Sequence, residues 1–156
     1  MKRWELRYWS KVEKRRGDSC WLWTGYKQPN GYGLFSLNGK DEYAHRISHE
    51  LRNGPIENGY VIDHTCHVTA CCNPAHLRVV TNKQNQEHRA GPTVANTSGA
   101  RGVSWHKPSQ KWFVSVKHNS KSHYGGIFTD LQEAAEAAKQ LRLSLFSHND
   151  ADRNPA

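Results

Sequence analysis

The sequence predicts an α+β protein with two small domains, and three observations support this prediction. Short β-prone runs alternate with amphipathic stretches. Residues 90–98, AGPTVANTS, are uncharged and have the composition of a linker. The chain of 156 residues is long enough for two small domains, neither of which can bury a large core. We therefore expect domains at residues 1–89 and 99–147, followed by a disordered tail at residues 148–156.

The first part of the chain should contain one helix and a few short strands. A helix over residues 3–16 is indicated by apolar residues at every fourth position: Trp4, Tyr8 and Val12. The stretch from residue 20 to residue 44 is rich in aromatic residues and glycine, which indicates two or three strands. Within it, Asn38-Gly39 favours a tight hairpin turn.

A helix, a hairpin and a second helix are expected next. The stretch AHRISHELRNG predicts a helix that ends at Gly54-Pro55. Apolar runs at residues 60–63 and 77–80 predict two strands joined by a long loop. The polar stretch NKQNQEHR predicts a helix with Thr81 as its cap. The expected order is therefore strand, loop, strand, helix.

After the linker, the pattern predicts a three-stranded antiparallel sheet packed on one helix. The β-prone runs GVSWH, KWFVSVK and SHYGGIF are separated by turn residues at Pro108-Ser109 and Asn119-Ser120. The helix opens at Thr129 or Asp130. Its apolar face consists of Leu131, Ala134, Ala135, Ala138, Leu141 and Leu145.

The positive charge of the chain favours nucleic acid as a partner. Lys and Arg number 22 against 14 Asp and Glu, which gives a formal net charge of +8. Between Ser98 and His123 there is no Asp or Glu, and the basic residues are Arg101, Lys107, Lys111, Lys117 and Lys121. The sequence shows no apolar run of bilayer length and no start typical of a signal peptide. We expect an intracellular DNA-binding protein with no membrane partner.

Asp63, His64 and Asn85 form a candidate catalytic group. Asp63 and His64 end the first strand of the expected hairpin, and Asn85 lies about one turn into the helix that follows it. A hairpin packed on a helix can bring these side chains around one cation. Asp63 and Asn85 would offer oxygen ligands to Mg²⁺ or Mn²⁺. Neutral His64 would activate a water molecule for phosphodiester hydrolysis.

Cysteine and histidine crowd the loop of this hairpin. Cys66, Cys71 and His76 are evenly spaced, a pattern compatible with tetrahedral Zn²⁺. Cys20, which precedes the WLW run, is the best candidate for the fourth ligand. Cys72 is the alternative, but adjacent cysteines rarely bind one ion. A structural Zn²⁺ would stabilise a loop that is long, polar and otherwise unsupported.

Alternation along KWFVSVK separates two faces of the expected sheet. Trp112, Val114 and Val116 would pack on the helix. The other face would be open, polar and basic, and would carry Arg101, Ser104, His106, Phe113, Ser115, Lys117, Ser122 and Tyr124. A narrow sheet can enter the major groove of duplex DNA, where side chains reach base edges. Lysines beside the face would meet phosphate, namely Lys107, Lys111, Lys117 and Lys121.

The stretch VIDHTCHVTACCNPAHLRVVTNKQN resembles the HNH homing endonucleases of phages and introns, as do CWLWTG, GYG and AHR upstream. The resemblance covers about residues 3–89. It implies a zinc-containing ββα-metal (His-Me finger) nuclease. In such a nuclease Asp63 and Asn85 would bind the catalytic divalent ion, and His64 would activate water.

The same resemblance suggests roles for four more residues. The middle, loop-tethering role of the HNH motif falls on Asn73 or on His76. His45 and Arg46, within AHR, become candidates for the region of the scissile phosphate. A buried structural role for His45 is an equal alternative.

The C-terminal stretch RGVSWHKPSQKWFVSVKHNSKSHYGGIFTDLQEAAEAA resembles the ethylene-response-factor (APETALA-type) DNA-binding domain, a three-stranded sheet on one helix. The match runs from about Gly99 to Leu145 and implies binding of duplex DNA. This sequence differs from plant members at several positions where they carry arginine or tryptophan: Ser104, His106, Ser115 and Ser122.

These features together predict a site-specific, homing-type endonuclease that nicks or cuts duplex DNA as a monomer or a homodimer. It would act in the cytoplasm of a bacterial or phage-infected cell, with Mg²⁺ or Mn²⁺ for catalysis and Zn²⁺ as a structural ion. One alternative is a restriction or packaging nuclease. Another is a DNA-binding regulator that has lost catalysis, against which the presence of Asp63, His64 and Asn85 argues.

Overall fold

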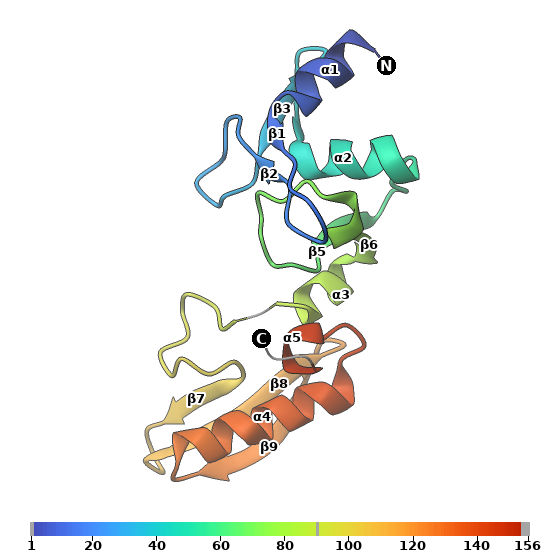
Figure 1. Ribbon diagram of the computed structural model, residues 1–156. Helices are drawn as coiled ribbons and strands as arrows, with labels where there is room; N and C mark the ends of the chain where they lie inside the picture. Colours follow the sequence, from blue (N-terminus) through green and yellow to red (C-terminus); the bar gives the residue numbers. More distant parts are fainter. Residues whose placement is uncertain (1, 90, 154–156) are drawn as a thin grey trace. The chain divides into compact units, whose positions relative to one another are not determined.

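The computed structural model describes residues 2–89 and 91–153 and has the mixed helix and strand content that the sequence predicts (Figure 1). The chain divides into two compact units, Met1–Asn82 and Lys83–Ala156. The division lies upstream of residues 90–98, where the sequence places the linker. Helix α3 (Asn82–Glu87) accounts for the difference, because its last residues bond to the second unit.

The N-terminal helix is shorter than the sequence predicts. Helix α1 spans Arg3–Trp9, so the prediction of a helix over residues 3–16 was wrong beyond Trp9. Strand β1 (Val12–Glu13) follows and pairs with β2 (Leu22–Trp23). Val12 thus reaches the core, but as part of a strand. Val12 keeps the helical spacing of Trp4 and Tyr8, but its backbone pairs with Trp23 in a strand.

A hairpin and a helix follow as expected. Strands β3 (Leu34–Leu37) and β4 (Lys40–Tyr43) pair antiparallel through the Asn38-Gly39 turn, where φ is 52° and 79°. Positive φ at both residues is the geometry that the Asn-Gly pair favours. Helix α2 (Ala44–Asn53) ends at Gly54, whose φ is 91°.

The order strand, loop, strand, helix is confirmed. Strand β5 (Tyr60–His64) pairs antiparallel with β6 (Leu77–Thr81), and the short helix η1 (Pro74–His76) closes the loop between them. Backbone bonds tie this loop to the core, because Trp23 N donates to Ala70 O and Cys72 N donates to Trp21 O. The loop that follows β5 is therefore fixed to the core by backbone hydrogen bonds.

The second unit has the sheet and helix that the sequence predicts. Strands β7 (Val103–His106), β8 (Lys111–His118) and β9 (Lys121–Phe128) form one antiparallel sheet in chain order. Helix α4 (Leu131–Leu145), capped by Asp130, crosses one face of it (Figure 1). The buried core between them consists of Val103, Val114, Ala134 and Ala138. No helix in the described part of the chain is both apolar enough and long enough to cross a bilayer.

The tail is not disordered over residues 148–153, contrary to the sequence-based expectation for residues 148–156. Helix α5 (Asp150–Arg153) folds back on α4. Arg142 bonds to both carboxylate oxygens of Asp152, at 2.6 and 2.8 Å, and Asn149 is fully buried. The polar composition of the tail concealed this long-range pairing. Residues 154–156 lie outside the described residues.

Replacing Asp152 by Ala should destabilise the second unit. Arg142 is only 6% exposed, so the change leaves a buried cation without its carboxylate, at a cost of about 3 kcal/mol in the free energy of unfolding. Urea unfolding measures this. Glu136→Ala, exposed on the same helix, is the control and should change stability by less than about 0.5 kcal/mol. Equal stability of the two variants would contradict the assigned ion pair.

The same pair makes stability depend on pH. Burial alone would raise the pKa of Asp152, but hydrogen bonds from Arg142 and Asn149 lower it overall. A depressed carboxylate pKa stabilises the fold above the unfolded value of about 3.9. That contribution should be lost as pH falls through the folded-state pKa, and Asp152→Ala should lack this part of the acid sensitivity.

Candidate functional site

Asp63 and His64 lie at the end of β5, where the strand enters its loop. Each is only 6% exposed. In the register of the hairpin, Asp63 faces Arg78, and Arg78 Nε donates to Asp63 Oδ2 at 2.8 Å. Sequence reasoning missed this ion pair, although a cross-strand pair of opposite charges is its usual signal. The carboxylate is thereby fixed in orientation.

The backbone of its own loop orients the His64 ring. His64 Nε2 lies 3.1 Å from the carbonyl oxygen of Cys71. Because a carbonyl can only accept, Nε2 must carry the proton, and Nδ1 keeps its lone pair in the neutral ring. Burial lowers the pKa of His64 below its ordinary value. This contact leaves Nδ1 of His64 available as an acceptor, and burial favours the neutral ring.

Two aromatic side chains pack against this ring. The centroids of the His45 and His64 rings are 4.7 Å apart in an edge-to-face arrangement, and Tyr32 lies 5.9 Å from His64. Burial lowers the pKa of His45 to about 3, so this ring is neutral at physiological pH. Its contacts are those of a buried packing residue. Arg46, the next residue of α2, is half-buried, and its place at the phosphate stays a prediction.

Asn85 lies in α3 and is half-buried. It belongs to the second compact unit, whereas Asp63 and His64 belong to the first. Its expected position, about one turn into the helix that follows the second strand of the hairpin, is confirmed. Shared binding of one cation by Asp63 and Asn85 stays a prediction.

The structure brings together the four side chains that the sequence selects as zinc ligands. Their ligand atoms lie within 4.8 Å of one another, in the cluster Cys20, Cys66, Cys71 and His76. His76 Nδ1 lies 3.6 Å from Cys20 Sγ and 3.5 Å from Cys71 Sγ. Zinc bonds of about 2.3 Å to sulfur and about 2.0 Å to nitrogen place the N···S edge of a tetrahedron at about 3.5 Å. The cluster therefore fits Zn²⁺.

Residues around this cluster support its geometry. Asp18 Oδ1 lies 3.0 Å from His76 Nε2, which leaves Nδ1 directed at the sulfur atoms. A carboxylate in this position fixes the tautomer of a metal-binding histidine. Asn73 donates through its side chain to Ser19 O and accepts from Ala75 N. The loop-tethering contacts are thus made by Asn73, while His76 lies in the cluster.

Cys72 is kept out of the cluster by its packing. It is 1% exposed and lies in the hydrophobic core with Tyr8 and Trp23. Burial raises the pKa of Cys72 to about 11, which disfavours the thiolate form that metal binding requires. The preference for Cys20 as the fourth member agrees with this geometry.

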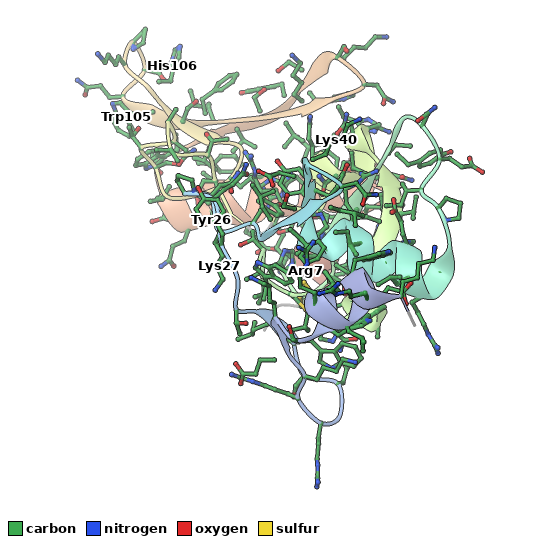
Figure 2. The ribbon with its side chains drawn as sticks, turned by 90° about the horizontal axis from the view of Figure 1, so that it is seen from above. Arg7, Tyr26, Lys27, Lys40, Trp105 and His106 are labelled. Atoms are coloured by element: carbon green, nitrogen blue, oxygen red, sulfur yellow. The ribbon has the colours of Figure 1, made fainter. Side chains whose placement is uncertain are left out.

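The open face of the second sheet carries most of the side chains expected to meet DNA. Ser104 lies opposite Phe113, and Ser115 lies opposite Tyr124. The hydroxyl groups of Ser115 and Ser122 share a hydrogen bond of 2.6 Å. The lysines expected at phosphate are all exposed: Lys107, Lys111, Lys117 and Lys121. Figure 2 shows His106 next to Trp105 at the end of β7.

Arg101 is engaged elsewhere. Its guanidinium donates to the main-chain carbonyls of Gln86, Glu87 and Arg89 at 2.6 to 3.1 Å. It also lies over the ring of Phe146. Burial lowers the pKa of Arg101 to about 10. Because these donors are used within the protein, they are not free to contact DNA, contrary to the prediction for Arg101.

Comparison with known proteins agrees with the geometry of the β5–β6 hairpin. A family model described as HNH endonuclease matches residues 42–87, a range that includes Asp63, His64 and Asn85. Residues 42–87 are therefore an HNH endonuclease domain, and the chain belongs to the same family as the gene 5.3 protein of Enterobacteria phage T3. The HNH match also contains three of the four residues of the Cys-His cluster, all but Cys20. It ends at Glu87, so the resemblance of the second unit to the ethylene-response-factor domain stays a prediction.

Proteins of two phages are similar to this chain. It is 38% identical over 74 residues to Protein 2.8 of Escherichia phage T7, which is 46% of this chain and 50% of that protein. It is 36% identical over 74 residues to Protein 3.8 of the same phage, covering 47% and 60%. An uncharacterized gene 5.3 protein of Enterobacteria phage T3 is 34% identical over 73 residues, covering 42% and 72%.

The chain spans half to three fifths of the length of the two T7 proteins. No solved structure matches it.

Purified HNH protein should hold about one zinc ion per chain. Cys66→Ser and Cys71→Ser should release the metal and lower the melting temperature of the first unit. The reason is that the ion would link the β5–β6 loop to Cys20, just before β2. Elemental analysis and thermal melting measure both effects. Cys72→Ala is the matched control and should keep the metal. A folded wild-type protein without zinc would contradict this assignment.

Proposed function

We propose that this protein is a metal-dependent endonuclease that hydrolyses phosphodiester bonds of duplex DNA. The observation that carries the proposal is the fixed state of His64. Its Nε2 bonds to the Cys71 carbonyl, its Nδ1 is left as a base, and a buried carboxylate adjoins it in the sequence. This arrangement, within a matched HNH domain, is the one that activation of water requires.

In the proposed reaction His64 Nδ1 takes a proton from the attacking water. The new bond forms between the water oxygen and phosphorus, and the bond from phosphorus to the 3′ oxygen breaks. The leaving 3′ oxygen takes up a proton from a water molecule and becomes a 3′ hydroxyl. The neutral, hydrogen-bonded ring performs its step without first losing a proton of its own.

Asp63 and Asn85 suit a hard divalent cation, because both offer oxygen ligands. Mg²⁺ or Mn²⁺ bound there would offset the negative charge that develops at the phosphate. Arg78 holds the Asp63 carboxylate from the opposite strand. Zn²⁺ in the Cys20, Cys66, Cys71 and His76 cluster would serve the fold, since it holds the loop that supplies the Cys71 carbonyl.

The open face of the second sheet is the proposed reader of duplex DNA. Its exposed lysines suit phosphate, and its hydroxyl and aromatic side chains suit base edges. We place the protein in the infected bacterial cell as a homing-type, site-specific enzyme, acting as a monomer or a homodimer. A restriction or packaging nuclease is the alternative within the same chemistry.

His64→Ala should lower the rate of plasmid cleavage by about 100-fold or more, because it removes the base. DNA affinity, measured by mobility shift without Mg²⁺, should change by less than about threefold. His67→Asn is the control. His67 is exposed in the same loop with φ of 56°, a conformation that Asn tolerates.

Cleavage by His64→Ala at the wild-type rate would refute the assignment of the base. A wild-type protein that binds DNA but does not cut it with Mg²⁺ or Mn²⁺ would instead favour the alternative, a DNA-binding regulator that has lost catalysis.

Replacing Lys111 and Lys117 together by Ala should weaken DNA binding and reduce its dependence on salt. Each lysine that contacts a phosphate contributes about one unit to the slope of log affinity against log salt concentration. Lys139→Ala, on the helix that covers the other face of the sheet, should leave the slope unchanged. Mobility shifts across a salt series measure the slopes. Equal slopes for all proteins would show that this face of the sheet does not contact DNA phosphates.

A further inference from the structure

Three aromatic rings form a line across the open face of the sheet in the second unit. They come from three strands: His106 from β7, Phe113 from β8 and Tyr124 from β9. The centroids of the His106 and Phe113 rings are 6.1 Å apart, and those of Phe113 and Tyr124 are 5.3 Å apart. The planes of the two pairs are inclined by 33° and 31°. Neighbouring rings are therefore closer to parallel than to perpendicular.

The line of rings is not part of the packed core of the unit. Tyr124 is 63% exposed, His106 is exposed and Phe113 is half-buried. The opposite face differs, because Trp112 and Phe128 pack there against the buried cluster beneath helix α4. Aromatic surface left in water costs free energy, and a group of exposed aromatic side chains is a typical mark of a binding surface.

The charge around the line of rings fits a polyanion. Residues 103–128, which contain all three strands, include no Asp or Glu. In the register of the sheet, Lys111 pairs with His106 at one end of the line. Exposed lysines that alternate with aromatic rings are the combination that binds single-stranded nucleic acids. The exposed lysines of this stretch are Lys107, Lys111, Lys117 and Lys121.

The faces of the bases are hidden in duplex DNA, because each base stacks on its neighbours about 3.4 Å away. Only base edges, sugars and phosphates stay accessible in the grooves. Phe113 has no polar atom, so it could contact only a thymine methyl group there. The three strands also contain no Arg, Asn or Gln, which make many of the specific contacts with base edges. The line of rings therefore suits base faces, which unpaired nucleotides offer.

The spacing of the rings supports the same conclusion. Adjacent centroids are 5.3 and 6.1 Å apart, wider than the roughly 3.4 Å between stacked bases. Bases that remain stacked on one another could not each reach a ring of their own. Bases of a single strand can separate and lie on successive rings, as they do on other proteins that present aromatic side chains from a sheet.

We propose that His106, Phe113 and Tyr124 bind unpaired nucleotides of DNA by stacking on their bases, while the exposed lysines contact the phosphates. This inference deepens the proposed function and rests on it for the choice of DNA as the ligand. The DNA that the second unit binds would carry a single-stranded segment, such as a bubble or an overhang, beside its paired part.

The test measures binding by fluorescence anisotropy with the full chain and without added Mg²⁺ or Mn²⁺. The probes are a labelled single strand, the fully paired duplex of the same sequence, and that duplex with a central mismatched bubble. Wild-type protein should bind the single strand and the bubble at least as tightly as the duplex. Phe113→Leu and Tyr124→Leu each remove a stacking ring, and each should weaken binding of the single strand and the bubble by about tenfold. Their affinity for the duplex should change by less than about threefold.

Two variants are controls. Tyr124→Phe keeps the ring and should bind the single strand as the wild type does. Trp105→Leu removes an aromatic side chain that is 45% exposed on the same sheet. Its ring contacts Trp112, on the face that helix α4 covers, with centroids 4.8 Å apart. This variant should keep the affinity for the single strand within about threefold of the wild type.

A second measurement uses the wild-type protein and does not depend on the folding of any variant. Single-stranded DNA that contains iodouracil is crosslinked by light, and mass spectrometry identifies the attached residues. We expect attachment to His106, Phe113 or Tyr124. Attachment only to residues outside the sheet would overturn the inference.

The remaining outcomes separate this inference from the proposed nuclease. Equal loss of duplex and single-strand binding in Phe113→Leu and Tyr124→Leu would overturn the inference, because the rings would then contact paired bases. Unchanged single-strand binding in both variants would also overturn it, and the nuclease would stand. Single-stranded RNA that binds about tenfold more tightly than the same DNA sequence would overturn the choice of DNA. A wild-type protein that binds unpaired DNA through these rings but cuts no DNA would overturn the nuclease and support the inference.

Discussion

The loop between β5 and β6 must hold its shape for the rest of the first unit to work, and Cys71 is the residue on which this depends. Its sulfur belongs to the Cys-His cluster, and its carbonyl oxygen accepts from the His64 ring. The same residue therefore links the proposed zinc site to His64, the proposed base. A structural zinc can contribute about 10 kcal/mol to a fold, as much as the whole stability of a small domain. If the cluster binds zinc as proposed, loss of the ion would release the His64 ring together with the loop.

Features determined by local chemistry could be predicted from the sequence. The Asn38-Gly39 turn, the end of α2 at Gly54 and the hairpin order all follow from residue types at fixed offsets. The cluster could also be predicted, because ligand spacing within one loop constrains geometry strongly. Cys20 was found from its place before a strand, and β2 does lie against the loop through the bridge between Leu22 and Cys71.

Features determined by partners distant in the sequence could not be predicted. The end of α1 at Trp9 depends on pairing between β1 and β2, and the order of the tail depends on Arg142 and Asp152. Asp18 and Arg78 were missed for the same reason. Arg101 is the clearest example. It lies in a segment without acidic residues, so the sequence placed its side chain on the open face of the sheet. Its donors instead satisfy carbonyls at the end of a helix.

The hydroxyl groups of Ser115 and Ser122 share one hydrogen bond in which either oxygen could be the donor. A hydroxyl group can donate or accept, and rotating one of the pair reverses the other. An arginine at such a position would commit the sheet to the acceptors of guanine. A face built from interchangeable hydroxyls would instead penalise a changed base only slightly. If this face reads DNA as proposed, recognition would tolerate single base changes in the target.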